Sequence, residues 1–165
     1  MLAEAGYPEG FRITLHGSND RFPNDARVLQ AIGQMWTRIG VRTEVDAMPY
    51  GPFQTRASAQ EFAAFLGTWG SGGEPSIGMT NTLGTFDPEK GTGSINRGRY
   101  SNPAFDDALS AATSEMDADK REAMLQDVMR LLIDDMPILP LYIQTNTWCQ
   151  RRSKIGPRGG AKLGH

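Results

Sequence analysis

The sequence predicts an α/β fold in which a mostly parallel sheet is flanked by helices, and three observations lead to that prediction. Residues 11–16 and 41–47 alternate apolar and polar side chains, which is typical of half-buried strands. The segment between them has apolar residues at helical spacing and ends at Gly40, a residue type that commonly follows the last turn of a helix. A strand, a helix and a strand joined by short connections form a βαβ unit, whose two strands are parallel.

The first helix is expected to begin after Asn24, whose side chain is a candidate N-cap. Its predicted inner face consists of apolar residues at helical spacing: Val28, Ile32, Met35, Trp36 and Ile39.

The middle of the chain predicts a short helix, a strand and a long loop. The helix lies around residues 53–59, and residues 62–67 are apolar on both faces, as in a strand covered by helices on both sides. Residues 70–99 are rich in Gly, Ser, Thr and Asn and show little periodicity. We therefore expect a long loop there, of the kind that is usually functional or poorly ordered.

The last third predicts two helices and a strand. Asn102 is an N-cap candidate with Pro103 at the first helical position, and Phe105, Leu109 and Ala112 mark the inner face. The second helix covers residues 117–134. Residues 138–144 are expected to form a strand, at a sheet edge or with a bulge, because Pro140 cannot donate to a sheet. The apolar stripe of the second helix is Met124, Leu125, Val128, Leu131 and Leu132.

Length and composition restrict the class of protein. A chain of 165 residues has the size of one domain or of one large lobe, and 39% hydrophobic residues suffice for a core. The net charge of −2 gives no basic face for nucleic acid. No apolar run approaches the roughly 18 residues of a membrane span. Cys149 is the single cysteine, so no intrachain disulfide forms, which is compatible with either side of a bacterial inner membrane.

The two ends of the sequence carry separate expectations. Residues 2–5 have the character of a last helical turn ended by Gly6, which suggests a piece of a longer protein, with a short independent turn as the alternative. The first residues have no signal-peptide features, so an export signal would lie upstream. Residues 151–165 are basic and glycine-rich, and we expect them to form a surface tail after a lobe that covers residues 1–150.

The candidate binding site lies beyond the carboxyl ends of the predicted strands, where open α/β sheets bind ligands. An aromatic ring beside glycines, with a carboxylate nearby, suits a site where backbone amides approach a ligand and the ring stacks on it. The alternative is that Trp69 caps the core and the glycines only turn the chain. The candidates from the three strand ends are Asn19, Arg21, Tyr50, Trp69, Ser71, Gly72 and Glu74.

The sequence offers no catalytic constellation, no metal site and no cofactor motif. Ser71 lacks the first glycine of a G-x-S-x-G nucleophile elbow, and residues 91–96 fail the last position of a G-x-G-x-x-G motif. His16 has no recognisable triad partner and is expected to be an exposed strand histidine. Two histidines and one cysteine give no metal-ligand spacing.

Five segments in a fixed order carry a resemblance to a known family. The most specific are L-A-E-A-G-Y-P at residues 2–8 and Y-S-N-P-x-F-D at residues 100–106. The others are residues 34–41, residues 69–71 and residues 138–142. Over nearly its whole length the chain resembles the C-terminal lobe of bacterial extracytoplasmic solute-binding proteins of the dipeptide, oligopeptide and nickel class.

The resemblance implies one lobe of a two-lobed, type II periplasmic-binding-protein-like fold, with the N-terminal lobe absent from this chain. It implies a periplasmic receptor that encloses a small molecule or peptide between its lobes and delivers it to the membrane permease of an ABC importer, without cofactor, catalysis or nucleic acid. A sensor of the chemoreceptor type and an importer receptor for a sugar, opine or metal chelate are the alternatives.

One position departs from the peptide-binding members of the family. Where these carry an aspartate that pairs with the α-amino group of the peptide, this chain has Gly72. A charge-assisted hydrogen bond of this kind contributes about 1.5–3 kcal/mol, so recognition of a free amino terminus would require Glu74 to take the same place. Arg97 and Arg99 are candidates to face a carboxylate, the alternative being solvated loop arginines.

Overall fold

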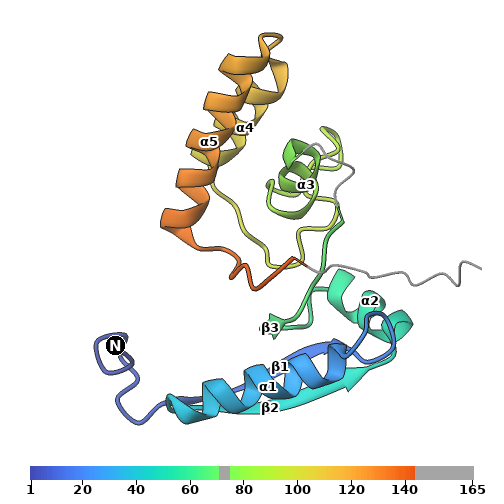
Figure 1. The fold of residues 1–165 in the computed structure, drawn as a ribbon, viewed down its shortest axis with the longest axis vertical. Coiled ribbons are helices and arrows are strands. Elements are labelled where there is room, and N and C mark those ends of the chain that lie inside the picture. Colours follow the sequence, from blue (N-terminus) through green and yellow to red (C-terminus); the bar gives the residue numbers. More distant parts are fainter. Residues whose placement is uncertain (71–74, 144–165) are drawn as a thin grey trace, which may run out of the picture.

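The computed structural model describes residues 1–70 and 75–143, which form two successive parts (Figure 1). The sheet part (residues 1–70) contains β1 (Phe11–Ser18), α1 (Asp25–Arg38), β2 (Val41–Met48), α2 (Tyr50–Ser58) and β3 (Ala64–Phe65). The helical part (residues 75–143) contains α3 (Pro75–Thr82), α4 (Pro103–Ser114) and α5 (Ala118–Asp135).

The sheet has the order β2-β1-β3, and both strand pairs are parallel. β1 and β2 pair along their full length, from Phe11 opposite Val41 to Ser18 opposite Met48, which confirms the βαβ unit. β3 pairs with β1 through only two residues, and both are half-buried. The strand predicted at 62–67 is therefore correct in place, but it is shorter and less covered than expected.

Helix α1 lies on one face of the sheet, rotated from the predicted orientation. Its buried residues are Asp25, Leu29 and Gly33, whereas the predicted inner residues Met35 and Ile39 are 60% and 64% exposed. Gly33 explains the rotation, since a Cβ at this position would lie 2.7 Å from Cγ2 of Val45. The absent side chain lets the helix backbone approach β2 closely at Gly33, whereas Val28, Ile32 and Trp36 of the predicted face are only half-buried.

Helix α2 covers the opposite face of the sheet. Met48, Phe53 and Ala57 form a buried cluster, against which Tyr50, Phe62 and Phe65 pack. His16 belongs to this face and is only 9% exposed, so the expectation of an exposed histidine is wrong. Its ring stacks on Phe62 with centroids 4.1 Å apart, and Nδ1 lies 3.3 Å from the carbonyl oxygen of Ala64.

The helical part has its own hydrophobic core. Asn102 caps α4 as predicted, because its side-chain oxygen accepts from the N–H groups of Ala104 (2.9 Å) and Phe105 (3.3 Å). The structure confirms the predicted inner faces of α4 and α5, because most of the residues that the sequence placed there are buried. The buried residues of this core are Met79, Leu83, Phe105, Leu109, Ala112, Leu125, Val128 and Leu132.

Helix α3 corrects the prediction that residues 70–99 form one long loop. Met79 and Leu83 pack in the same core as Phe105, so tertiary contacts stabilise a helix that the sequence Pro75–Thr82 does not favour by itself. The segment that follows is held by Asn96, which is 5% exposed. Its amide donates to the carbonyl oxygens of Gly84 (2.9 Å) and Tyr100 (2.7 Å).

The Y-S-N-P-x-F-D segment ties α4 to its neighbours. Asp135 at the end of α5 accepts hydrogen bonds from the Tyr100 hydroxyl (2.7 Å) and the Asn102 amide (2.6 Å), and these bonds lower the pKa of Asp135. Asp106 accepts from the backbone N–H of Thr85 at 3.0 Å. The residues that carry the resemblance most specifically therefore have structural roles in the fold.

The ends of the described chain give one confirmed and one wrong prediction. Gly6 has a φ of 87°, and the N–H of Tyr7 donates to the carbonyl oxygen of Leu2 at 2.8 Å, as in a Schellman motif that ends a helical turn. Residues 138–143 are not a strand, and most of their apolar side chains are exposed. Gln144 and the basic tail at 151–165 lie outside the described residues.

A polar junction joins the two parts. The Gln60 amide donates to the carbonyl oxygen of Asn96 (3.4 Å), and Nη2 of Arg99 donates to the carbonyl oxygen of Gln60 (3.0 Å). The guanidinium of Arg97 donates to the side-chain oxygen of Gln54 on α2. The two hydrophobic clusters described above share no residue, so these contacts are polar rather than part of a common core.

Candidate functional site

The loop after β1 is organised by the carboxylate of Asp25, which is 6% exposed. Its Oδ2 accepts from the hydroxyl of Ser18 (2.9 Å) and the N–H groups of Arg21 (3.0 Å) and Phe22 (3.2 Å), and Oδ1 accepts from the N–H of Ala26 (2.8 Å). Burial alone would raise the pKa of Asp25, but these hydrogen bonds outweigh burial and lower it. The predicted N-cap residue Asn24 makes no side-chain cap hydrogen bond, so Asp25 holds this turn instead.

The carboxyl ends of β1 and β2 are joined by Asn19 and Asp20. The backbone N–H of Asn19 donates to the carbonyl oxygen of Met48 (3.0 Å), and its side-chain amide donates to that of Ala47 (3.2 Å). Oδ1 of Asp20 accepts from the N–H of Tyr50 at 2.8 Å. These bonds place Tyr50 at the start of α2 beside the loop that carries Arg21.

A continuous series of contacts links Arg21, Tyr50, Gln54 and Arg97, which we call the arginine–tyrosine cluster. The guanidinium carbon of Arg21 lies 4.8 Å from the centre of the Tyr50 ring, a cation–π contact. The Gln54 amide donates to the Tyr50 hydroxyl, and the Gln54 oxygen accepts from Arg97. The cluster thus combines an aromatic ring with a guanidinium group at either end.

The structure brings together four of the residues predicted from the strand ends and the glycine-rich segment: Asn19, Arg21, Tyr50 and Arg97. Sequence reasoning missed Gln54, because the helix predicted at residues 53–59 did not reach Tyr50. In the structure α2 begins at Tyr50, and the spacing of four residues places the two side chains on one helix face. Arg99 does not join the cluster, since its guanidinium donates to the backbone of Gln60.

Trp69 is 45% exposed and lies against α3, where its indole nitrogen is 2.8 Å from the position that a Cβ on Gly78 would occupy. This contact supports the alternative in which the ring packs on the scaffold, while its exposed part stays accessible. Ser71, Gly72 and Glu74 lie outside the described residues, so their roles stay predictions.

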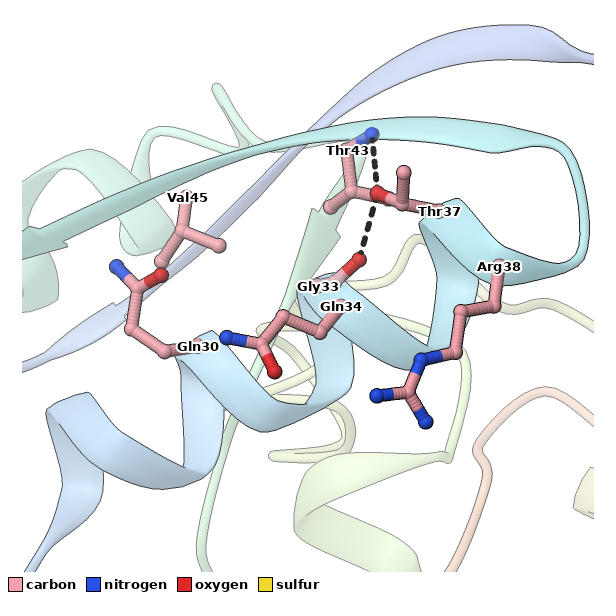
Figure 2. Close-up of a pocket in the computed structure, with 7 residues that line it drawn as sticks. All are labelled: Gln30, Gly33, Gln34, Thr37, Arg38, Thr43 and Val45. Carbon is pink, nitrogen blue, oxygen red and sulfur yellow. Dashed lines mark hydrogen bonds between the residues drawn. The ribbon is translucent and has the colours of Figure 1, made fainter.

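A shallow groove of about 550 Å³ lies elsewhere, between α1 and β2 (Figure 2). Its lining is mainly neutral and polar, and the Thr37 hydroxyl inside it donates to the carbonyl oxygen of Gly33 at 2.8 Å. It includes Thr43 and Val45, in the middle of β2, whereas the arginine–tyrosine cluster follows the carboxyl ends of the strands. The groove and the cluster are therefore separate features.

Two other features are absent from the part of the chain that the structure describes, namely a metal site and a membrane-spanning helix. Within residues 1–70 and 75–143, no group of three His, Cys, Asp or Glu side chains could hold a metal ion. Over the same residues, the structure has no helix with the length and apolarity needed to cross a bilayer.

Comparison with known proteins identifies the relatives of this chain. No protein-family model matches it. Di/tripeptide-binding protein 2 of Pseudomonas aeruginosa is 31% identical over 161 residues, which cover 96% of this chain and 30% of that protein. Heme-binding protein A of Haemophilus influenzae is 28% identical over 148 residues, 86% of this chain and 26% of that protein. The chain is a homologue of the ABC solute-binding proteins.

Solved structures agree with this relationship. The structure of HbpA2 from Haemophilus parasuis matches with a TM-score of 0.74 and 26% sequence identity, covering 82% of this chain and 27% of that one. The open parallel sheet with flanking helices is thus a lobe of the periplasmic-binding-protein fold, as the sequence predicts. The chain spans less than a third of the length of the relatives it matches, and these relatives are substrate-binding transport proteins rather than enzymes.

Proposed function

We propose that this chain is the C-terminal lobe of the substrate-binding component of an ABC importer. In this proposal the receptor is periplasmic, captures a peptide or peptide-like solute between two lobes, and delivers it to a membrane permease. The observation that carries the proposal is the arginine–tyrosine cluster at the carboxyl ends of β1 and β2, the edge at which open α/β sheets bind ligands. The homology to di- and tripeptide-binding proteins supports the same solute class.

The two-lobed arrangement supplies the mechanism. A ligand that contacts both lobes binds the closed state better than the open state, and it shifts the equilibrium toward closure by that difference in affinity. The cluster in this lobe would provide one half of the contacts, and the lobe that this chain lacks would provide the other half. The closed form would then be the one that the permease recognises.

The scaffold of the proposed site suits this role because it is fixed before ligand arrives. The carboxylate of Asp25 holds the loop that carries Arg21, and Asp20 holds the first residue of α2. A side chain whose backbone is already positioned loses less conformational freedom when it binds a ligand. We therefore expect binding to close the lobes without rebuilding the cluster.

A thermal-shift screen of the complete protein, in which this chain is joined to its opposite lobe, tests the proposal. Di- to pentapeptides, sugars, opines, heme and nickel chelates are compared, because a ligand that binds only the native state raises the melting temperature by mass action. We expect peptides to give the largest shift. The 165-residue chain alone is expected to respond weakly or not at all, and tight calorimetric binding by it would contradict the two-lobed mechanism.

A variant pair locates the binding site. Tyr50→Ala removes the ring on which Arg21 stacks and the hydroxyl bonded to Gln54, so it should abolish most of the ligand-induced shift. Tyr7→Ala is the matched control, because Tyr7 is 51% exposed and lies before β1, at the opposite end of that strand from the cluster. Equal loss in both variants, or in neither, would place the binding site elsewhere.

A further inference from the structure

Arg97 differs from Arg56, another half-buried arginine, in what it bonds. Arg56 donates to the carboxylates of Asp46 (3.4 Å) and Glu61 (2.8 Å), so its charge is balanced within the protein. Among the described residues, the guanidinium of Arg97 has one hydrogen-bond acceptor, the neutral side-chain oxygen of Gln54, and no carboxylate within 4.0 Å. A neutral acceptor holds a guanidinium in place without neutralising it.

The Nε atom of Arg97 is the second observation. It is buried and has no hydrogen-bond partner among the described residues, although arginine carries five N–H donors in a rigid fork. A buried donor left unpaired is unfavourable, and the cost is larger on a charged group. Nη1 also has no partner among the described residues and, unlike Nε, is not buried, so an added anionic acceptor can bond to the guanidinium there.

We infer that Arg97 is the receptor for an anionic side group of the ligand, and that Gln54 is the positioning residue that presents it. This inference rests on the proposed function and adds a ligand class to it: peptides or peptide-like solutes that carry an acidic side chain. Arg97 belongs to the helical part and Gln54 to α2, so their contact brings the charge across the polar junction to the arginine–tyrosine cluster.

The charges along the cluster favour the same class. Guanidinium groups stand at both ends of the series from Arg21 through Tyr50 and Gln54 to Arg97. Two carboxylates hold the backbone of the cluster: Asp20 accepts from the N–H of Tyr50, and Asp25 accepts from the N–H of Arg21. Among the described residues neither carboxylate bonds to the guanidinium of Arg21 or Arg97, so these two guanidinium groups favour an anionic group over a cationic one.

Matched peptide pairs test the inference in the complete protein by calorimetry. Ala-Glu is compared with Ala-Gln, and Glu-Ala with Gln-Ala, since the members of each pair differ in charge and hardly in shape. In at least one pair the glutamate peptide should bind about tenfold to hundredfold more tightly than the glutamine peptide, which is the range for a charge-assisted hydrogen bond. Equal affinities within both pairs would overturn the inference and leave peptide binding intact.

Arg97→Gln should lower the affinity for glutamate peptides far more than that for glutamine peptides, so that the preference between them falls below about threefold. Arg99→Gln is the matched control, because this neighbouring arginine donates to the backbone of Gln60 outside the cluster. Its preference should equal that of the unsubstituted protein. A preference that persists in Arg97→Gln, or that disappears in Arg99→Gln, would contradict the assignment.

Gln54→Glu gives a second test that does not depend on losing a contact. The introduced carboxylate would pair with Arg97 internally, so the preference for glutamate peptides should fall at least tenfold while the melting temperature without ligand is not lowered. A purely structural role of Gln54 predicts unchanged selectivity, and that result would overturn the inference. Absence of binding for every peptide in the folded protein would instead contradict the proposed function on which it rests.

Discussion

The Y-S-N-P-x-F-D segment at residues 100–106 and the arginine–tyrosine cluster differ in how their polar groups are satisfied. In the segment, Tyr100, Asn102 and Asp106 each find partners within the chain, at Asp135 or on the backbone of Thr85. In the cluster, Arg97 has a single neutral acceptor and a buried nitrogen without a partner among the described residues. Polar groups that all have partners within the chain stabilise the fold, whereas donors without an internal partner can bond to a ligand. The segment most useful for detecting kinship is therefore not the one that we propose to contact the solute.

The largest expected effect is on the stability of the helical core, against which the Y-S-N-P-x-F-D segment packs. Phe105 is fully buried in the helical core, so Phe105→Ala should lower the free energy of unfolding by about 3–5 kcal/mol through lost burial and the cavity left behind. Urea denaturation of the chain measures it. Phe86→Ala is the control, because Phe86 is 62% exposed and should cost little. Similar losses in the two variants would show that the helical core is not the one described.

An intermediate effect is expected at Asp25, which fixes the loop of the cluster. Its pKa in the folded protein is lower than in the unfolded chain, so its stabilising contribution is present above about pH 4 and is lost as the pH falls through the folded pKa. Asp25→Asn should lower the free energy of unfolding at pH 7 by about 2 kcal/mol and flatten the pH dependence at the acidic end. Denaturation curves between pH 7 and pH 2 measure both quantities, and parallel curves for the two proteins would exclude this role.

The smallest effect on stability is expected at Tyr100, whose hydroxyl makes a single hydrogen bond, to Asp135. Tyr100→Phe keeps the edge-to-face contact with Phe105, so it should cost less than about 1 kcal/mol. Tyr7→Phe serves as the control, because the Tyr7 ring packs on Phe11 and its hydroxyl has no partner among the described residues. A melting-temperature change of equal size in both variants would show that the Tyr100 hydroxyl does not help to link α4 to α5.

Local sequence signals predicted those elements whose stabilising contacts are also local. Asn102 caps α4 through groups two and three residues away, and Gly6 ends the first turn in the same way. The alternation in β1 and β2 correctly predicted a parallel pair, because the short connections to the helix between them leave little choice of topology. In each case, the residues that determine the element lie within or beside it.

The errors arose where distant residues decide the structure. The orientation of α1 depends on the space between Gly33 and Val45, which a count of bulky apolar residues does not register. Helix α3 depends on Met79 reaching the core around Phe105. Residues 138–143 have the composition of a strand, but within the described chain no strand pairs with them. The site was predicted in part, because strand ends can be located from sequence, whereas the Gln54–Arg97 contact joins segments more than 40 residues apart.

The polar junction between the sheet part and the helical part has a consequence for engineering. Because the two apolar clusters share no residue, replacing residues 75–143 by the matching piece of a relative would leave the interior of the other half unaltered. A chimera of this kind has to restore only a few side-chain contacts, at Gln54, Gln60 and Trp69, to rejoin its halves. Such exchange offers a route to receptors with new solute preferences that does not require repacking an interior.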